Sequence, residues 1–500
     1  MTVEFSPPLA STADGKFHSE AAAGNAEAAD AAIAALAESL AGTAPVDRVL
    51  LKAAAGAGKS YALRRMVKES IEDGRASRVA VVAFTNKQIH PLAVSLGKEL
   101  GKDKVCIFVK KGTAGSLPDD VHTFATIAET TPEIPANARV VIATCHKLGA
   151  MGEFGRQRAS LGNARNGSTP YDVLFVDEAW QIPHHLFDKV RGIAPLWVGV
   201  GDVGQLPPLE IGSNPWRGDA KYNPYRAWPT EYDDDARTWA KELPAVWRPA
   251  AGHLALWRAF YPEWSELNCV AAPGDRGIEL GDGLSDLART VWEQVGSGVP
   301  TLLEVDGLPA PEAADIDLPL VGLVEDLLDE LFTAGFTLVG ADLGDGEPTG
   351  VMTRQSPGDE PDGPLVAVLA TRNQAVDDAA EAVARLAKRH SLTDKDLLSS
   401  TVDSYQGQTN GLTVAVHPLT GAAELDEFNS AFGRLAVTCT RATHGLLMVT
   451  RTGLDTLLGE APARSGTPFG EPGNRQLPRQ THQRILATFA RGTLTVTPAP

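Results

Sequence analysis

The chain has 500 residues, of which 43% are hydrophobic and 22% charged, and its formal net charge is −18. These values are ordinary for a globular protein with two or three domains, and they argue against a disordered chain or one coated in basic patches. No apolar run approaches the ~20 residues of a bilayer-spanning helix, so we expect no membrane contact.

The N-terminus lacks the basic start and apolar core of a secretory signal. The four cysteines are scattered without metal-ligand spacing, which indicates free thiols in a reducing compartment, so we expect a cytoplasmic protein. Residues 46–170 carry 19 lysines and arginines against 11 acidic residues, although the chain as a whole is acidic. This basic region could form a groove for phosphates or could be a chance fluctuation, and charge alone does not decide.

In chain order, the first predicted element is an Ala-rich packing helix at 21–40, within an N-terminal helical segment at 1–45. Strands and helices then alternate through a first domain at 46–250. This alternation predicts a parallel sheet with helices on both faces. The expected strands are the apolar runs at 49–51, 79–84, 140–143, 173–176 and 196–200.

Residues 251–317 are rich in Gly, Pro and acidic residues, and we expect an irregular linker or insertion there. A second α/β pattern occupies 318–458, and a Pro- and Gly-rich tail at 459–500 ends in a short helix at 482–491. The predicted fold class is therefore α/β, with two tandem domains built on parallel sheets and with small irregular insertions.

A glycine-rich loop follows the first strand of the first domain and opens a helix, as a phosphate-binding loop requires. Its small residues let backbone N–H groups face the phosphates at a helix N-terminus. Lys59 would reach the β- and γ-phosphates, and Ser60 would ligate Mg²⁺. The loop reads Ala53-Ala54-Ala55-Gly56-Ala57-Gly58-Lys59-Ser60.

Two further strands end in polar residues. Asp177 and Glu178 follow the run at 173–176, where the aspartate could hold Mg²⁺ through water and the glutamate could orient or deprotonate an attacking water. An N-cap aspartate and a solvated glutamate would look the same in isolation, but the preceding phosphate loop favours catalysis. Gln205 follows the run at 196–200 and is placed to sense a γ-phosphate.

Two arginines complete the candidate site. Arg248 lies in a Val-Trp-Arg-Pro segment, and Arg441 follows the helix predicted at 428–438. A guanidinium stays charged and can grip phosphate in a fork. A single arginine is more often part of a surface salt bridge. The assignment of these two arginines to a phosphate site therefore depends on the motifs that surround them.

Taken in order, these segments resemble the motifs of superfamily 1 helicases. The Gln-Leu-Pro-Pro ending of one motif and the short insertions resemble superfamily 1B most, the branch of nonsense-decay-type and RecD-like helicases. The similar segments are the phosphate loop (motif I), 81–87 (motif Ia), 143–148 (the next strand-contacting element), 177–181 (motif II), 201–208 (motif III), 246–249 (motif IV), 402–409 (motif V) and 437–442 (motif VI).

The resemblance implies two RecA-like P-loop NTPase domains that bind ATP and Mg²⁺ between them and move 5′→3′ on single-stranded DNA or RNA. Backbone contacts would dominate strand binding, with little sequence preference. The catalytic residues would be Lys59, Glu178, Gln205, Arg248 and Arg441. The nucleotide contacts would be Ala53, Gly56, Ala57, Gly58, Lys59, Ser60 and Gly407, and the strand contacts would be Phe84, Thr85, Asn86, His146 and Ser404.

The sequence departs from the family pattern at two positions that matter for specificity. No glutamine precedes Gln88, so the adenine-reading glutamine upstream of the phosphate loop is missing, and the preference for ATP over other triphosphates is open. Thr409 stands where many nonsense-decay-type members have a glutamate, which is closer to the RecD-like enzymes.

Three functions are compatible with these observations. The leading hypothesis is a nucleic-acid-dependent ATPase or helicase. A P-loop kinase or nucleotidyl-transfer enzyme would explain the phosphate loop and Asp177, but not the arginines or the second α/β pattern. A motor-like ATPase subunit that loads or remodels a protein partner without unwinding would use the acidic body and the tail. That partner would be a nuclease or a subunit of a repair or defence complex.

Overall fold

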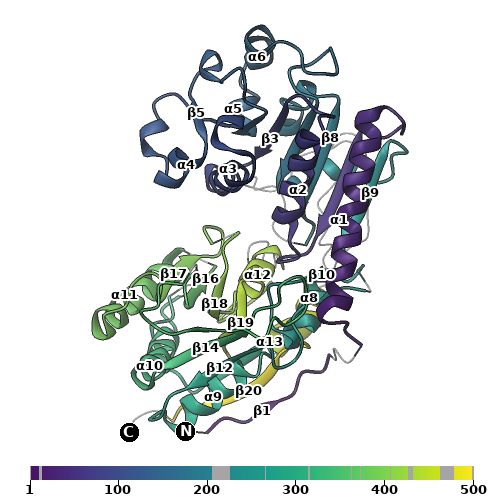
Figure 1. The fold of residues 1–500 in the computed structure, drawn as a ribbon. Coiled ribbons are helices and arrows are strands. Elements are labelled where there is room, and N and C mark those ends of the chain that lie inside the picture. The colour runs from purple at the N-terminus through teal and green to yellow at the C-terminus, as the bar shows by residue number, and fades with distance from the viewer. Residues whose placement is uncertain are drawn as a thin grey trace.

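The computed structural model shows two lobes joined along one side (Figure 1). It describes residues 2–10, 14–204, 224, 226–264, 266–313, 316–361, 363–371, 373–405, 407–425, 429, 432–461 and 478–497. Within these ranges, none of the helices combines the length and the apolar character that crossing a bilayer would require.

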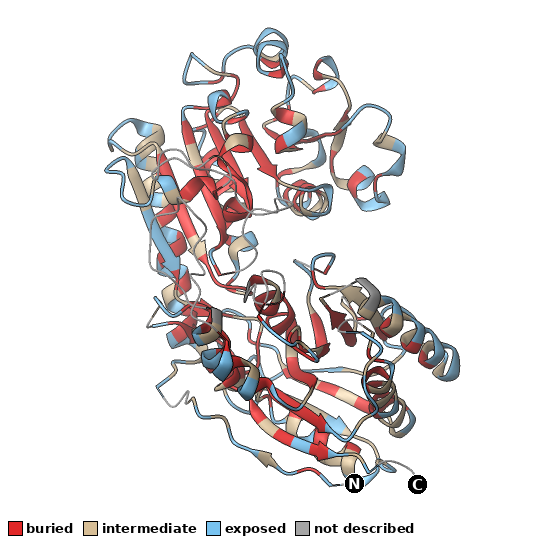
Figure 2. Cartoon of the chain, turned by 180° about the vertical axis from the view of Figure 1, so that it is seen from behind, coloured by how far each residue is buried: buried red, intermediate tan, exposed pale blue. Residues whose placement is uncertain are grey.

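The first lobe is built on an eight-stranded sheet whose neighbouring strands all pair in parallel. Most of its strands are apolar because helices and loops cover both faces, and Figure 2 shows them as the buried centre of the lobe, whereas the edge strand at Thr238–Leu243 is partly exposed. The order across the sheet is β5 (Thr126–Ala128), β4 (Val105–Phe108), β6 (Val140–Thr144), β3 (Val79–Ala83), β7 (Val173–Asp177), β8 (Leu196–Asp202), β2 (Arg48–Ala53) and β9 (Thr238–Leu243).

The helices of this lobe include α1, which was predicted at 21–40 and spans His18–Ala41. It ends at Gly42, whose φ of 69° is a left-handed conformation that glycine adopts without strain. Its first turn reaches the second lobe, where His18 Nε2 lies 2.8 Å from Asp275 Oδ2. The other helices are α2 (Lys59–Glu72), α3 (Asn86–Leu100), α4 (Asp119–Phe124), α5 (Cys145–Leu148), α6 (Glu153–Leu161) and α7 (His184–Phe187).

The second lobe has a seven-stranded sheet that is parallel except at one edge, where the first strand pairs antiparallel with the last. The order is β1 (Phe5–Ser6), β20 (Ala490–Thr495), β13 (Thr301–Asp306), β19 (Ala442–Arg451), β18 (Asn410–Val416), β16 (Val366–Ala370) and β17 (Leu397–Thr401). Its helices include α9 (Asp286–Gly296), α10 (Leu318–Ala334), α11 (Asn373–His390), α12 (Phe432–Cys439), α13 (Leu454–Glu460) and α14 (Pro478–Leu486). The predicted fold class, two α/β domains in tandem, is confirmed.

The segment 251–317 differs from the irregular linker expected there. It contains α8 (Leu254–Phe260) and α9, and its strand β13 lies inside the second sheet between β20 and β19. The tail helix α14 also ends earlier than expected, and 490–495 forms β20 instead. These strands pair with partners far away in sequence, so local composition does not reveal them.

Two smaller sheets accompany the two large ones. A two-stranded parallel ladder joins β10 (Ala245–Val246) to β11 (Asn268–Cys269), next to the start of α8. A three-stranded antiparallel sheet consists of β12 (Arg276–Leu280), β14 (Phe336–Ala341) and β15 (Met352–Gln355). The antiparallel sheet contacts β19 and so belongs with the second lobe.

One buried amide on α1 ties three segments of the first lobe together. Asn25 is 7% exposed, and its Nδ2 donates to the carbonyl oxygens of Ala57 at 2.9 Å and Ala245 at 2.8 Å. The backbone N–H of Ala245 donates to Asn25 Oδ1 at 2.8 Å. The helix therefore holds the phosphate loop and β10 in fixed relation.

Replacing this amide tests the contribution of α1. Asn25→Ala should lower the free energy of unfolding of the first lobe by about 2 kcal/mol, because it leaves buried backbone groups without partners. Urea denaturation followed by circular dichroism measures the change. Glu27→Ala, an exposed position on the same helix, should change it by less than about 0.5 kcal/mol. Equal midpoints for the two variants would contradict the assignment.

Candidate active site

The glycine-rich loop connects β2 to α2, at the carboxyl end of the first sheet. Gly56 and Gly58 have φ values of +74° and +92°, which side-chain-bearing residues rarely adopt. A Cβ atom on Gly56 would also lie 2.4 Å from the Cβ of Arg248. Both glycines are therefore required by conformation, and the loop packs directly against the segment that carries Arg248.

Two aromatic residues hold the middle of this loop. Trp257 Nε1, on α8, donates to the carbonyl oxygen of Ala55 at 2.8 Å. The backbone N–H of Ala55 donates to the hydroxyl of Tyr261 at 3.0 Å. The sequence did not reveal this support, because aromatic residues in an apolar helix look like ordinary core residues.

Tyr261 also connects the phosphate loop to the end of β8. Because its hydroxyl accepts from Ala55, it uses its own proton to bond Asp202 Oδ1 at 2.7 Å, and the same oxygen accepts the backbone N–H of Gly204 at 2.9 Å. Burial raises the pKa of both Asp202 and Tyr261. The 201–208 segment is thus fixed to the loop at its start, whereas the predicted sensor Gln205 lies outside the described residues.

The two carboxylates at the end of β7, Asp177 as its last residue and Glu178 directly after it, are both buried, and their surroundings differ. Glu178 adopts a left-handed φ of +50° and forms an ion pair with Lys59. Its second carboxylate oxygen accepts from Gln181 Nε2 at 3.0 Å. Asp177 Oδ1 has no hydrogen-bond partner among the described residues. Burial and the neighbouring Glu178 raise the pKa of Asp177 to about 7.

These residues fit a magnesium ion. The unpartnered oxygen of Asp177 is buried, and Ser60 lies exposed in the first turn of α2, so two hard oxygen donors are available at the loop. Oxygen ligands of this kind are the ones that Mg²⁺ prefers, together with phosphate oxygens and water. The ion, when bound, would neutralise charge on the phosphates.

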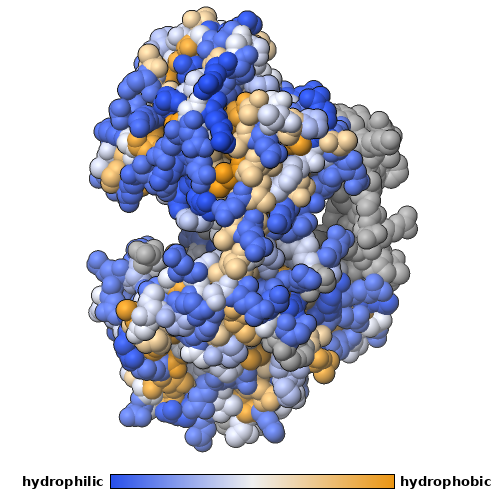
Figure 3. Space-filling view, turned by 45° about the vertical axis from the view of Figure 1, so that its right-hand side comes forward, coloured by the Kyte–Doolittle hydropathy of each residue, from blue (hydrophilic) through white to orange (hydrophobic). Residues whose placement is uncertain are grey.

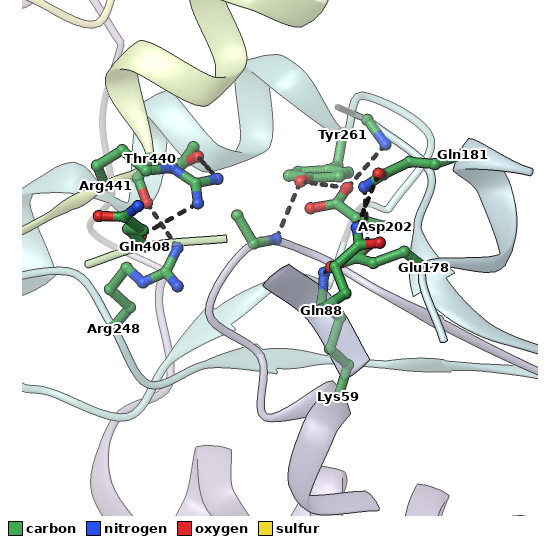
Figure 4. Close-up of polar contacts among 12 residues, drawn as sticks. Lys59, Gln88, Glu178, Gln181, Asp202, Arg248, Tyr261, Gln408, Thr440 and Arg441 are labelled. Atoms are coloured by element: carbon green, nitrogen blue, oxygen red, sulfur yellow. Dashed lines mark hydrogen bonds and ion pairs between the residues drawn. The ribbon is translucent and has the colours of Figure 1, made fainter. Parts of the chain in front are cut away.

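The two candidate arginines lie together on the other side of the loop (Figure 4). Arg248 Nη1 donates to the carbonyl oxygen of Thr440 at 2.9 Å, and Arg441 donates to the carbonyl oxygens of Gln408 at 3.2 Å and Val437 at 3.0 Å. Neither forms an ion pair within the part of the chain that the structure describes. Burial lowers the pKa of both, and for Arg248 the adjacent Arg441 charge is the second cause.

The arginine pair therefore has positive charge without a compensating carboxylate in contact. Guanidinium groups stay protonated at neutral pH even in such surroundings. Asp202 and Glu178 are the carboxylates whose charges act on Arg441 most strongly, which places the two sets of charges on opposite sides of one small region. An anion bound there would contact cations from both lobes.

The residues of the first lobe that were predicted to contact a nucleic-acid strand follow the carboxyl ends of two neighbouring strands of its sheet. Thr85 and Asn86 are exposed after β3, and His146 is exposed after the neighbouring β6. The rings of Phe84 and His146 are 5.8 Å apart. Ser404 is exposed on the second lobe after β17, so the structure does not bring it into the same cluster. Gly407, a predicted nucleotide contact, follows it with a φ of +84°.

Comparisons with known proteins support a P-loop domain. Residues 37–210 match a family model described as an AAA domain. The matched segment contains the phosphate loop and the two carboxylates at the end of β7. No curated protein matches the chain.

Among solved structures, the chain is similar to helicases at low identity. The arterivirus nonstructural protein 10 helicase in complex with DNA is 13% identical, with a TM-score of 0.39 over 86% of this chain and 64% of that chain. The helicase MrfA bound to DNA is 11% identical, with a TM-score of 0.39 over 90% and 51%. The Hef helicase domain of Pyrococcus furiosus is 10% identical, with a TM-score of 0.33 over 82% and 94%. This chain spans less than two thirds of the viral helicase, and these likenesses are too distant to bear on its activity.

The raised pKa of Asp177 gives a pH-dependent stability. Between the ordinary value of 3.8 and about 7, the folded protein holds a proton that the unfolded chain has released, so the stability of the ligand-free protein falls as pH rises through this window. Asp177→Asn should remove this dependence. At pH 8 the variant should be more stable than the parent by up to about 4 kcal/mol, and near pH 4 the two should converge.

Chemical denaturation at pH 4, 6 and 8 with a metal chelator present measures the difference. Asp73→Asn, at the exposed end of α2, provides the control because it should leave the pH profile unchanged. A stability gain for Asp177→Asn that is the same at all three pH values would contradict the shifted pKa.

Proposed function

We propose that the chain is a nucleic-acid-dependent ATPase and helicase of superfamily 1B that moves 5′→3′ along a single strand. The observation that carries the proposal is the arrangement of buried charge around the phosphate loop. Carboxylates and Lys59 come from the first lobe, Arg441 comes from the second, and Arg248 lies where the two lobes join. A nucleotide bound there would contact both lobes, so its hydrolysis would change how they hold together.

Each charged residue has a distinct proposed role. Lys59 would leave Glu178 and bind the β- and γ-phosphates, which frees the Glu178 carboxylate to orient a water molecule for attack. Arg248 and Arg441 would stabilise negative charge that builds up on the transferred phosphoryl group. Asp177 and Ser60 would hold the magnesium ion, and Gln205 would sense the γ-phosphate.

The strand would run across both lobes. Figure 3 shows a hollow between the lobes with a largely hydrophilic rim, which gives a polar strand access. Thr85, Asn86 and His146 would contact it on the first lobe, and Ser404 would contact it on the second. Because the nucleotide would also bridge the lobes, closing and opening would move these two contact sets relative to each other.

Strand displacement tests this proposal directly. The parent chain with ATP and Mg²⁺ should separate DNA or RNA duplexes that carry a 5′ single-stranded tail, and it should leave duplexes with only a 3′ tail intact. Lys59→Ala and Glu178→Gln should lose at least about 100-fold in hydrolysis and all displacement, because each removes a group that acts on the reacting phosphate. Lys68→Ala, on the same helix as Lys59, should behave like the parent.

The outcomes separate the alternatives. Displacement of 3′-tailed duplexes would contradict the direction, and full activity in Glu178→Gln would contradict the catalytic assignment. Strand-stimulated hydrolysis without any displacement would favour a motor that loads or remodels a protein partner. Repeating the assay with GTP settles the nucleotide preference.

A further inference from the structure

A line of hydrogen bonds connects the start of α3 to the Glu178 carboxylate (Figure 4). The backbone N–H of Thr85 donates to Gln88 Oε1 at 2.9 Å. Gln88 Nε2 donates to Gln181 Oε1 at 3.3 Å, and Gln181 Nε2 donates to Glu178 Oε2 at 3.0 Å. The other oxygen of Glu178 faces Lys59. Two glutamine side chains therefore span the distance between the exposed end of β3 and the buried catalytic candidates after β7.

The chemistry of the two ends fixes the orientation of both amides. A backbone N–H can only donate, so Gln88 must turn its oxygen toward Thr85 and its NH₂ group toward Gln181. An ionised carboxylate can only accept, so Gln181 must turn its NH₂ group toward Glu178 and its oxygen toward Gln88. Each amide accepts on one side and donates on the other, and no other assignment satisfies all three contacts.

The two ends of this line differ in exposure. Thr85 and Asn86 are exposed, whereas Gln181 and Glu178 are only 8% and 7% exposed. Thr85 and Glu178 follow the ends of β3 and β7, which are neighbouring strands of the sheet, so only a short, packed distance separates the two ends of the line. Gln181 lies on the single turn of 3-10 helix at Ala179–Gln181, directly after the left-handed Glu178.

We propose that Gln88 and Gln181 are positioning residues that couple strand binding at Thr85 and Asn86 to the placement of the Glu178 carboxylate. The inference rests on the proposed function, because it requires a single strand of nucleic acid to bind at the start of α3. A strand that contacts this loop shifts the Thr85 backbone and with it the Gln88 amide. Gln181 follows, and the Glu178 carboxylate turns from its resting pair with Lys59 toward the position that hydrolysis requires.

A single substitution separates this role from a structural one. Gln88 is also the third residue of α3 and forms a capping box with Thr85. Gln88→Glu keeps the cap, because a carboxylate accepts the Thr85 N–H equally well, but it cannot donate to Gln181. Gln181→Met keeps the size and removes both contacts of the second amide. Gln294→Glu, on α9 of the second lobe, is the matched control for the change of charge.

The measurement is the ratio of kcat with saturating single-stranded oligonucleotide to kcat without it, for the full chain with ATP and Mg²⁺. In Gln88→Glu and Gln181→Met this ratio should fall by about tenfold, which corresponds to about 1.4 kcal/mol in the activation free energy. The melting temperature of Gln88→Glu, the Kd of both variants for a non-hydrolysable ATP analogue and the ratio in Gln294→Glu should match the parent, which a merely structural role of the glutamines would not produce.

The outcomes distinguish the inference from the function on which it rests. A parent chain that the oligonucleotide stimulates, together with equal stimulation of Gln88→Glu and Gln181→Met, would overturn the relay and leave the proposed function standing. A parent chain that no DNA or RNA oligonucleotide stimulates would overturn the proposed function, and the relay with it.

Discussion

The structure is organised around a group of buried charged side chains at the phosphate loop. In the described ranges of the chain, only some of these side chains have a partner of opposite charge. Among the described residues, Lys59 and Glu178 contact each other, whereas Asp177, Asp202, Arg248 and Arg441 are held by neutral groups or by none. Burying an unpaired ion costs several kcal/mol, so such an arrangement persists only where the rest of the fold supports it. A magnesium nucleotide carries both signs of charge, and it would pair the carboxylates through its cation and the arginines through its phosphates.

The rest of the fold supplies that support. The carboxyl ends of the parallel strands β2, β7 and β8 bring the phosphate loop, the two carboxylates and Asp202 to one edge of the first sheet. Trp257 of α8 and Tyr261, directly after this helix, then fix the loop, and Tyr261 joins it to Asp202. In the sequence, α8 lies after β9 of the first sheet and before β13 of the second sheet. The helix that holds the phosphate loop is therefore also part of the connection between the two lobes.

Much of this could be predicted from the sequence, and the exceptions have a common cause. The phosphate loop, the strand ending in Asp177 and the tandem α/β organisation follow strong local patterns, and the fold class was confirmed. Strands β1, β13 and β20 pair over hundreds of residues, which no local pattern reveals. The contacts of Asn25 and Tyr261, and the contact of Gln88 with Gln181, were missed for the same reason, because an amide or hydroxyl shows such a role only through partners distant in sequence. The individual roles of the site residues stay predictions.

The most direct test of the account is a crystal structure of the chain with Mg²⁺ and a non-hydrolysable ATP analogue. We expect the triphosphate to separate Lys59 from Glu178, with the γ-phosphate in contact with Lys59, Arg248 and Arg441. We expect the hydroxyl of Ser60 to be a ligand of the metal. A triphosphate bound away from the loop, or one that leaves Arg441 without a phosphate contact, would contradict the claim that a nucleotide joins the two lobes.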